Sequence, residues 1–263
     1  MAFALTWLPD VLKAAGLNVE VQPGWETRGI GDMGIVRGVM CHHTAGPATG
    51  NMPCLGVITN GRPDLRGPLS QLGLGRDGTY YVIAAGKAQH AGKGRWQGVT
   101  TGNTNFIGIE AENRGIAADP WPAVQMDAYR RGVAAILGKI GVGAIMCCGH
   151  KEYALPLGRK SDPSFDMIDF RARVAALLTG IAPAPSPDIG ASPDTGESPR
   201  PVLRRGARGA FAKELQAKLG LPEDGIFGPN TETKVRAFQQ AQGLTADGVV
   251  GAKSWAALDA AFP

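Results

Sequence analysis

The chain holds only four histidines, and each lies in a segment that carries other groups able to do chemistry: His42, His43, His90 and His150. The most polar of these segments reads GHKEYALPLGRKSDPSF and places His150 near Lys160 and Asp162. A core strand would not tolerate the lysine and aspartate, and the internal proline and glycine disfavour a regular helix. We therefore predict a loop that delivers three polar groups to one place.

Two carboxylates lie at the end of another segment, NFIGIEAEN, which contains Glu110 and Glu112. Two imidazoles and one carboxylate form a known ligand set for Zn²⁺ that leaves a fourth position open for water. Zinc lowers the pKa of that water to about 7, and hydrolysis then needs a base and a group that stabilises the oxyanion. From spacing alone, either glutamate serves as the base and Lys160 as the electrostatic helper. The short HExxH motif is absent, so these residues by themselves indicate a zinc hydrolase of unknown substrate.

The elements that must position these groups alternate between strand and helix patterns. Apolar, β-branched runs predict strands within residues 35–46, 78–84, 105–113 and 143–150, and helical periodicity covers 124–141 and 165–180. This mixture predicts an α/β fold, a mixed β-sheet flanked by helices, whose strand ends aim the polar groups at one cleft. Because neighbouring strand residues point to opposite faces, Cys41 should face the core if His42 faces the site.

The C-terminal part has a different character and contains an internal echo. Residues 180–200 are rich in Pro, Ser, Gly and Asp, which predicts a linker between a domain of residues 1–179 and a module of residues 201–263. In that module DGIFGP and DGVVGA separate three short helical runs, which predicts a small all-α, three-helix unit. Asn230 or Thr231 is the expected N-cap of its middle helix, and Gly243 the expected stop.

Composition limits the remaining possibilities. The formal net charge is +4, without the stripe of Lys and Arg interleaved with aromatics that nucleic-acid binding needs, so no nucleic-acid partner is expected. No uncharged apolar stretch reaches the ~18 residues of a membrane span. Four cysteines are too few for a disulfide scaffold, and three lie in apolar runs typical of buried positions: Cys41, Cys147 and Cys148. A monomer is expected.

Four segments in order along the chain carry a family resemblance: VMCHHTAG, SQLGLGRDGTYYVIAAGKAQHAG, NFIGIEAEN and the segment around His150. Together they resemble the type 2 N-acetylmuramoyl-L-alanine amidase family, over about residues 30–178. The resemblance implies a Zn²⁺ cofactor held by His42, His150 and Asp162, with Glu110 and Lys160 as catalytic residues. Gln71 departs from the family pattern, where many members carry Tyr or His, and cannot do acid–base work. The C-terminal module resembles the peptidoglycan-binding domain type 1; a helical bundle for another ligand is the alternative.

The resemblance implies hydrolysis of the amide between the lactyl group of muramic acid and L-alanine of peptidoglycan. Glu110 would take a proton from the attacking water and pass it to the leaving amine, while Lys160 stabilises the oxyanion. His43 and His90 are expected to contact the substrate, Glu112 to be a supporting partner or to form a salt bridge, and Thr44 to hydrogen-bond near the metal.

Three roles fit these features to different degrees. The N-terminus lacks the basic region of a signal peptide, so we expect synthesis in the cytoplasm and, for a phage or prophage endolysin, holin-type release to the cell wall. A bacterial recycling or remodelling amidase is the second possibility, although a recycling enzyme gains little from a polymer-binding tail. A non-catalytic peptidoglycan-binding protein would be expected to lack one of the metal ligands, and all three are present.

Overall fold

The computed structural model describes residues 3–180, 203–207 and 209–262. The chain divides into two compact units, one ending at Asp188 and the other beginning at Ile189, and each is described by itself. Apart from Gly180, the predicted linker lies outside the described residues, so its boundaries stay a prediction.

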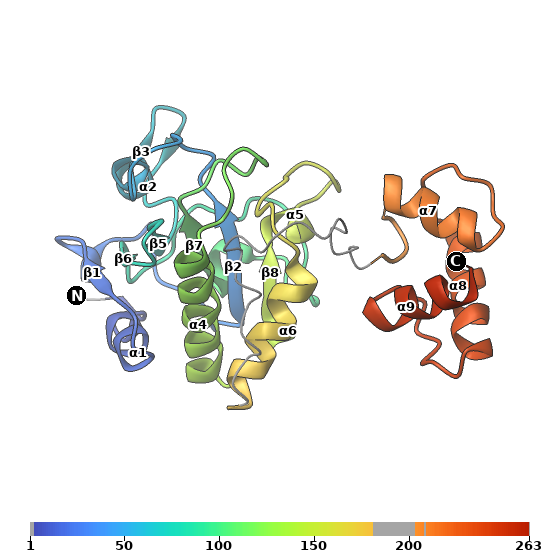
Figure 1. Cartoon of the computed structure of the whole chain (residues 1–263). Helices are drawn as coiled ribbons and strands as arrows, with labels where there is room; N and C mark the ends of the chain where they lie inside the picture. Colours follow the sequence, from blue (N-terminus) through green and yellow to red (C-terminus); the bar gives the residue numbers. More distant parts are fainter. Residues whose placement is uncertain (1–2, 181–202, 208, 263) are drawn as a thin grey trace. The chain divides into compact units, whose positions relative to one another are not determined.

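The N-terminal unit is built on a six-stranded sheet in the order β1-β6-β5-β7-β2-β8 (Figure 1). Only the β5–β6 pair is antiparallel and every other pair is parallel, which confirms the predicted mixed sheet. The bounds are β1 Val19–Val21, β2 Gly38–His43, β5 Leu72–Leu74, β6 Tyr80–Val82, β7 Phe106–Ala111 and β8 Cys147–Gly149.

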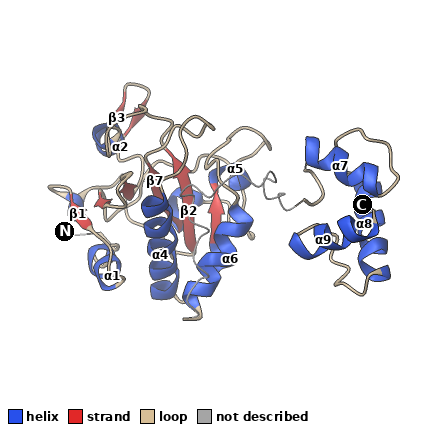
Figure 2. Ribbon diagram, in the orientation of Figure 1, coloured by secondary structure: helices blue, strands red, loops and turns tan. Residues whose placement is uncertain are grey.

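Helices α4 (Ala123–Ile140) and α6 (Met167–Leu178) lie side by side across one face of the sheet, and α1 (Leu8–Ala14) packs beside α4 (Figures 1 and 2). Their apolar sides and one face of the strands form the main core, which includes Cys41 and Phe170. Helix α4 ends at Ile140, and its C-cap Gly141 takes the left-handed conformation, φ 71°, that glycine adopts most readily.

Two local expectations need correction. The last helix of this unit begins at Met167 rather than at residue 165, because the Asp166 side chain accepts a hydrogen bond from the Ile168 N–H and caps the helix. The predicted strand at 143–150 starts with a 3-10 turn, Ala144–Met146, and only Cys147–Gly149 pairs with β2.

Short elements that the sequence patterns did not reveal complete this unit. They are η1 Trp25–Thr27, α2 Leu55–Asn60, the hairpin of β3 Gly61–Arg62 and β4 Leu65–Arg66, α3 Gly102–Asn105 and α5 His150–Tyr153. Such elements are too short to show a periodic pattern.

The register of three parallel strands positions the functional residues. His42 of β2 pairs with Glu110 of β7, and on its other side Cys41 pairs with Gly149 of β8, directly before His150. All three strands therefore end at the same edge of the sheet, where open α/β sheets bind their ligands. As predicted, Cys41 belongs to the main core, whereas its neighbour His42 points to the other face.

The described part of the C-terminal unit contains three helices around its own small core, as predicted. The helices are α7 Ala210–Lys218, α8 Pro229–Ala241 and α9 Ala252–Ala261. Helix α8 begins at Pro229 with Gly228 as its N-cap, so the expected Asn230 or Thr231 cap is wrong: both residues already lie in the first turn. Proline at the first helical position needs no N–H partner, which favours this earlier start.

The sequence echo is a structural repeat. Gln216 Nε2 donates to Asp224 Oδ1 at 2.7 Å, while its Oε1 accepts from the Gly225 N–H at 2.8 Å. In the second copy, 23 residues later, Gln239 contacts Asp247 and Gly248 in the same way, at 3.0 and 2.9 Å. Each buried glutamine thus holds one Asp-Gly turn.

No helix in the described part of the chain combines the length and the hydrophobicity of a membrane-crossing segment.

Candidate metal centre and active site

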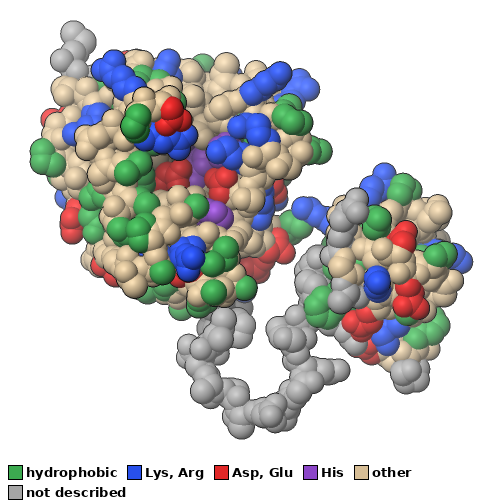
Figure 3. All heavy atoms as spheres, turned by 90° about the horizontal axis from the view of Figure 1, so that it is seen from above, with side chains coloured by type: hydrophobic (Ala, Val, Ile, Leu, Met, Phe, Trp, Pro, Cys, Tyr) green, Lys and Arg blue, Asp and Glu red, His purple; other side chains and the backbone are tan. Residues whose placement is uncertain are grey.

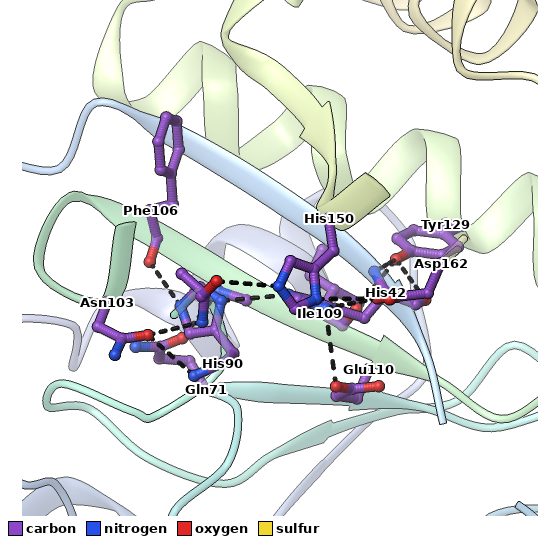
Figure 4. Close-up of polar contacts among 12 residues, drawn as sticks. His42, Gln71, His90, Asn103, Phe106, Ile109, Glu110, Tyr129, His150 and Asp162 are labelled. Atoms are coloured by element: carbon purple, nitrogen blue, oxygen red, sulfur yellow. Dashed lines mark hydrogen bonds and ion pairs between the residues drawn. The ribbon is translucent and has the colours of Figure 1, made fainter. Parts of the chain in front are cut away.

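Three side chains converge at the carboxyl edge of the sheet (Figure 4). Asp162 Oδ2 lies 2.9 Å from His42 Nδ1 and 3.2 Å from His150 Nδ1. All three residues are at most 9% exposed. The structure therefore brings together the three residues that sequence comparison with the amidase family singled out as metal ligands, and it identifies them as a group able to hold a metal ion.

The donor chemistry of this cluster fits a divalent metal. The His150 Nε2 atom lies 2.9 Å from the Ala91 carbonyl oxygen, which can only accept, so Nε2 carries the proton. In a neutral ring, Nδ1 then presents a lone pair toward the Asp162 carboxylate, which also only accepts. Acceptors so close together need a cation between them, and separations near 3 Å resemble the ~3.4 Å between ligand atoms of a tetrahedral zinc site.

Local structure explains how residues far apart in sequence meet here. His42 ends β2, and His150 opens α5 directly after β8. The Lys151 N–H donates to the Asp162 backbone carbonyl at 2.6 Å, which closes the intervening loop. The predicted return of the loop to His150 is therefore observed, although its first four residues form a helical turn.

Burial keeps two of the imidazoles neutral. Desolvation lowers the pKa of His42 to about 4, with Asp162 opposing the shift, and it lowers the pKa of His90 well below its ordinary value. Burial also opposes ionisation of Asp162, but the close contacts with the His150 and His42 rings outweigh it and hold the pKa of that carboxyl below its usual range. Neutral imidazoles and an ionised carboxylate are the forms that bind a metal.

Glu110 lies next to the cluster. Its Oε1 lies 3.8 Å from His42 Nδ1, and its side chain is 18% exposed. Among the described residues, its buried Oε2 has no hydrogen-bond partner. Desolvation, and next the charge of Asp162, raise the pKa of Glu110 to about 8. A buried, under-bonded carboxylate facing a cavity is suited to moving a proton.

Two members of the cluster, His150 and Asp162, line a cavity of about 510 Å³ together with Glu110. Figure 3 shows histidine and acidic side chains in a hollow of this unit, with Lys and Arg side chains around its mouth. Three cations line this cavity: Arg62, Arg159 and Lys160. Lys160 is exposed, and its charge acts on both His42 and Glu110. The cavity thus combines carboxylates inside it with positively charged side chains around its mouth.

The remaining predicted residues take different positions. His43 and Thr44 line the cavity, and His43 Nδ1 accepts from the Ser164 N–H at 3.2 Å. His90 also borders the cavity but is only 7% exposed, and both ring nitrogens have protein partners, His42 and the Phe106 carbonyl.

Glu112 and Gln71 lie away from the cavity. Glu112 is fully buried and accepts from the Thr44 hydroxyl at 2.7 Å and from the Cys54 N–H at 3.0 Å, so it supports the loop after β2 rather than forming a salt bridge. Gln71 is also buried and accepts from the Gly108 N–H at 2.7 Å.

Sequence reasoning missed two supporting groups. Asn103 accepts hydrogen bonds from the backbone N–H groups of His90 and Ala91, at 2.9 and 2.7 Å. Arg171 of α6 makes a bidentate pair with Glu152, which accepts from the Gly149 N–H beside His150. Neither residue carries a local signal, because its partner is set by tertiary packing.

Comparison with known proteins adds two family matches. Residues 32–165, just over half of the 263-residue chain, match the family described as N-acetylmuramoyl-L-alanine amidase. Residues 209–258 match the family described as putative peptidoglycan binding domain. Each match falls within one compact unit.

Individual relatives are distant or cover part of the chain. An uncharacterized protein in the bpoA1 3′ region of Kitasatospora aureofaciens is 36% identical over 100 residues, which are 33% of this chain and 85% of that protein. The crystal structure of a selenomethionine AmpD derivative is 24% identical and covers 65% of this chain and 98% of its own, with a TM-score of 0.46. AmiD of E. coli, complexed with the substrate anhydro-N-acetylmuramic acid-L-Ala-D-gamma-Glu-L-Lys, is 21% identical and covers 92% and 95%, with a TM-score of 0.45.

Proposed function

Because the chain belongs to the N-acetylmuramoyl-L-alanine amidase family, we propose that it is a zinc-dependent enzyme whose metal is held by His42, His150 and Asp162. The observation that carries this proposal is the convergence of two imidazole Nδ1 atoms on one carboxylate oxygen, within 2.9 and 3.2 Å. Two histidines and one carboxylate leave a fourth position for water or substrate, as in catalytic zinc sites. When bound, zinc would polarise the scissile carbonyl and acidify water.

The chain's own residues supply the proton transfers and the charge stabilisation. Glu110 accepts a proton from the attacking water, and the same carboxyl then donates it to the amine of L-alanine as the amide bond breaks. Its buried, unpaired Oε2 and its raised pKa support this assignment. Lys160, on the cavity rim, stabilises the oxyanion of the tetrahedral intermediate.

The cavity also supports an assignment of substrate contacts. His43 lines the cavity, and its imidazole accepts a hydrogen bond from the Ser164 N–H. His43 is therefore proposed to contact the muramyl-peptide. Arg62 and Arg159 line the same cavity and match the carboxylates of a stem peptide in charge.

A lytic role on polymeric cell wall, as a phage or prophage endolysin, follows from the second domain. A peptidoglycan-binding domain in the same chain as an amidase domain raises the local concentration of wall substrate around the active site. An enzyme that degrades the polymer benefits from this, whereas an enzyme that acts on soluble fragments does not need it. Acting alone as a monomer is sufficient for this role.

The test is mass spectrometry of the fragments released from purified peptidoglycan by untreated, chelated and zinc-restored protein. We expect free stem peptides that begin at L-alanine, their loss on chelation, and their recovery with zinc. Muropeptides whose bond between sugar and peptide stays intact in every sample would contradict the amidase assignment. Undiminished release after exhaustive chelation would contradict zinc dependence alone.

A further inference from the structure

Two consecutive residues, His90 and Ala91, form a strip that contacts both proposed histidine ligands. Figure 4 shows the His90 ring among the polar contacts of this site. His42 Nε2 lies 3.1 Å from His90 Nδ1, and His150 Nε2 lies 2.9 Å from the Ala91 carbonyl oxygen. In both ligands, these are the nitrogens that point away from Asp162.

The proton positions in this strip follow from its acceptors. His90 Nε2 lies 3.2 Å from the Phe106 carbonyl, which can only accept, so the proton of a neutral His90 is on Nε2. His90 Nδ1 is then a bare acceptor, and the nitrogen facing it, His42 Nε2, must donate. A neutral His42 therefore carries its proton on Nε2 and presents the lone pair of Nδ1 to Asp162.

His150 reaches the same tautomer by a separate hydrogen bond. The Ala91 carbonyl accepts the Nε2 proton, so His150 also turns a bare Nδ1 toward Asp162. Both histidines are thus set as Nδ1 ligands, one by the His90 ring and the other by the next backbone carbonyl.

Asn103 fixes the strip itself. Its side chain faces two N–H donors, those of His90 at 2.9 Å and Ala91 at 2.7 Å, so the atom that receives them is the amide oxygen. Gly108 lets the His90 ring pack against the β7 backbone, because a Cβ at this position would lie 2.8 Å from His90 Cγ. Backbone and ring are held independently of any substrate.

We propose that His90 and Asn103 are positioning residues that hold both histidine ligands in the Nδ1 metal-binding tautomer, and that His90 does not contact the substrate. This inference rests on the proposed zinc site. Hydrogen bonds to the second nitrogen of a ligating histidine fix its tautomer and ring orientation, and losing such a bond typically weakens metal affinity about 10- to 100-fold.

The experiment compares variants of the full chain that differ only in the acceptor. His90→Leu removes the acceptor for His42, whereas His90→Asn keeps an oxygen near the position of Nδ1. Asn103→Leu releases the strip and leaves His90 in place, whereas Asn103→Asp keeps an oxygen acceptor. Asn51→Leu is the matched control. Asn51 accepts a hydrogen bond from the Asp77 N–H and donates one to the Tyr81 hydroxyl, and neither bond involves the proposed metal cluster.

Zinc dissociation constants are measured by competition with a chromophoric chelator, together with the absorption spectrum of the cobalt-substituted proteins and the melting temperature of the metal-free forms. We expect about 10- to 100-fold weaker zinc binding and a changed cobalt spectrum for both leucine variants at positions 90 and 103. The Asn, Asp and control variants should stay within about threefold of the parent.

Three results overturn the inference in distinguishable ways. If the parent chain binds zinc tightly and both leucine variants bind it equally well, the positioning role is wrong while the zinc site stands. If the parent chain binds no zinc, the proposed function fails first and the inference fails with it. A lowered melting temperature without a change in zinc affinity assigns these residues to structure only, and this also overturns the proposal.

Discussion

At the residue scale, Glu110 is the most unusual group of the site. It ends a strand among apolar neighbours, yet its carboxylate faces a cluster that already contains Asp162. Without a bound metal, burial and the neighbouring carboxylate outweigh the charge of Lys160 and favour the protonated form. A bound metal would favour the ionised form, so metal binding would also prepare Glu110 to accept a proton as the proposed base.

Replacing Glu110 by Gln should abolish the proton transfer and keep the shape of the site. We expect kcat to fall by about 10²- to 10⁴-fold, because general acid–base catalysis contributes on this order. Zinc affinity should change little, since Glu110 is not among the ligands. Initial rates of stem-peptide release and a zinc titration check this; an unchanged kcat would assign the base elsewhere.

The same variant tests the pKa of Glu110 through stability. The folded pKa of about 8 lies above the ordinary 4.5, so the metal-free fold binds this proton more tightly than the unfolded chain does. Its stability contribution is complete below about pH 4.5 and is lost as pH rises through 8. In chelator, Glu110→Gln should therefore gain stability relative to the parent between pH 5 and 8, on the order of a few kcal/mol. Melting temperatures of the two proteins that run parallel across this range would contradict the shift.

Lys160 is proposed to act through its charge on the oxyanion. Lys160→Ala should lower kcat by about 10²- to 10³-fold, the usual cost of one lost stabilising group, and leave zinc binding intact. Lys160→Arg, which keeps the charge, should retain most of the rate. Equal losses in both variants, measured as initial rates under saturating zinc, would argue for a role in shape instead of charge.

At the element scale, the junction between β8 and α5 sets the orientation of His150. Glu152 caps the Gly149 N–H at 2.9 Å, and Arg171 holds Glu152 at 2.6 and 2.9 Å while it also donates to the Cys147 carbonyl. The Arg171 guanidinium lies 5.2 Å from the centre of the Trp96 ring. Helix α6 therefore supports a proposed metal ligand that it does not itself carry.

Arg171→Met should leave the Glu152 charge buried without its partner. We expect a loss of about 3 kcal/mol in the free energy of unfolding, as for other buried ion pairs broken on one side, and weaker zinc binding. Arg173→Met is the matched control on the same helix, because Arg173 pairs with Asp169, which is 51% exposed, and such a pair contributes below about 1 kcal/mol. Urea unfolding of both variants decides this; equal losses would contradict the supporting role.

At the scale of the whole molecule, the chain pairs a catalytic unit with a separate module built from a duplicated turn. Each unit has its own core, so removal of one leaves the apolar core of the other complete. The two family matches fall one in each unit. Binding and catalysis are therefore separable by truncation.

A chain that ends at Gly180 should keep its kcat/KM on soluble muropeptides within about twofold of the parent. On insoluble cell wall it should be about 10- to 100-fold less effective at low enzyme concentration, because the effective concentration gained by tethering is lost. Turbidity of wall suspensions and sedimentation binding assays measure this. Equal activity of both proteins on intact walls would contradict a wall-binding role of the C-terminal module.

The long elements could be predicted from the sequence, because their signals are local. The apolar, β-branched runs predicted β2 and β7, the helical period over residues 124–141 predicted α4 to within one residue at each end, and the repeated Asp-Gly turns predicted the three-helix module. The ligand set His42, His150 and Asp162 also came from sequence, through the resemblance of three ordered segments to one family. Local patterns missed the start of α8 at Pro229, where proline overrode the expected cap.

How these residues are placed relative to one another could not be predicted from the sequence, because strand pairing and loop closure join residues that are far apart in sequence. The register of β2 against β7 sets Glu110 beside His42, and the Lys151 bond to the Asp162 carbonyl closes the ligand loop. The hydrogen bonds of Asn103 and His90 depend on the packing of α3 and β7, which no periodic pattern encodes. Geometry of this kind sets which nitrogen of each histidine faces Asp162, and it is fixed by contacts that form only when the whole unit has folded.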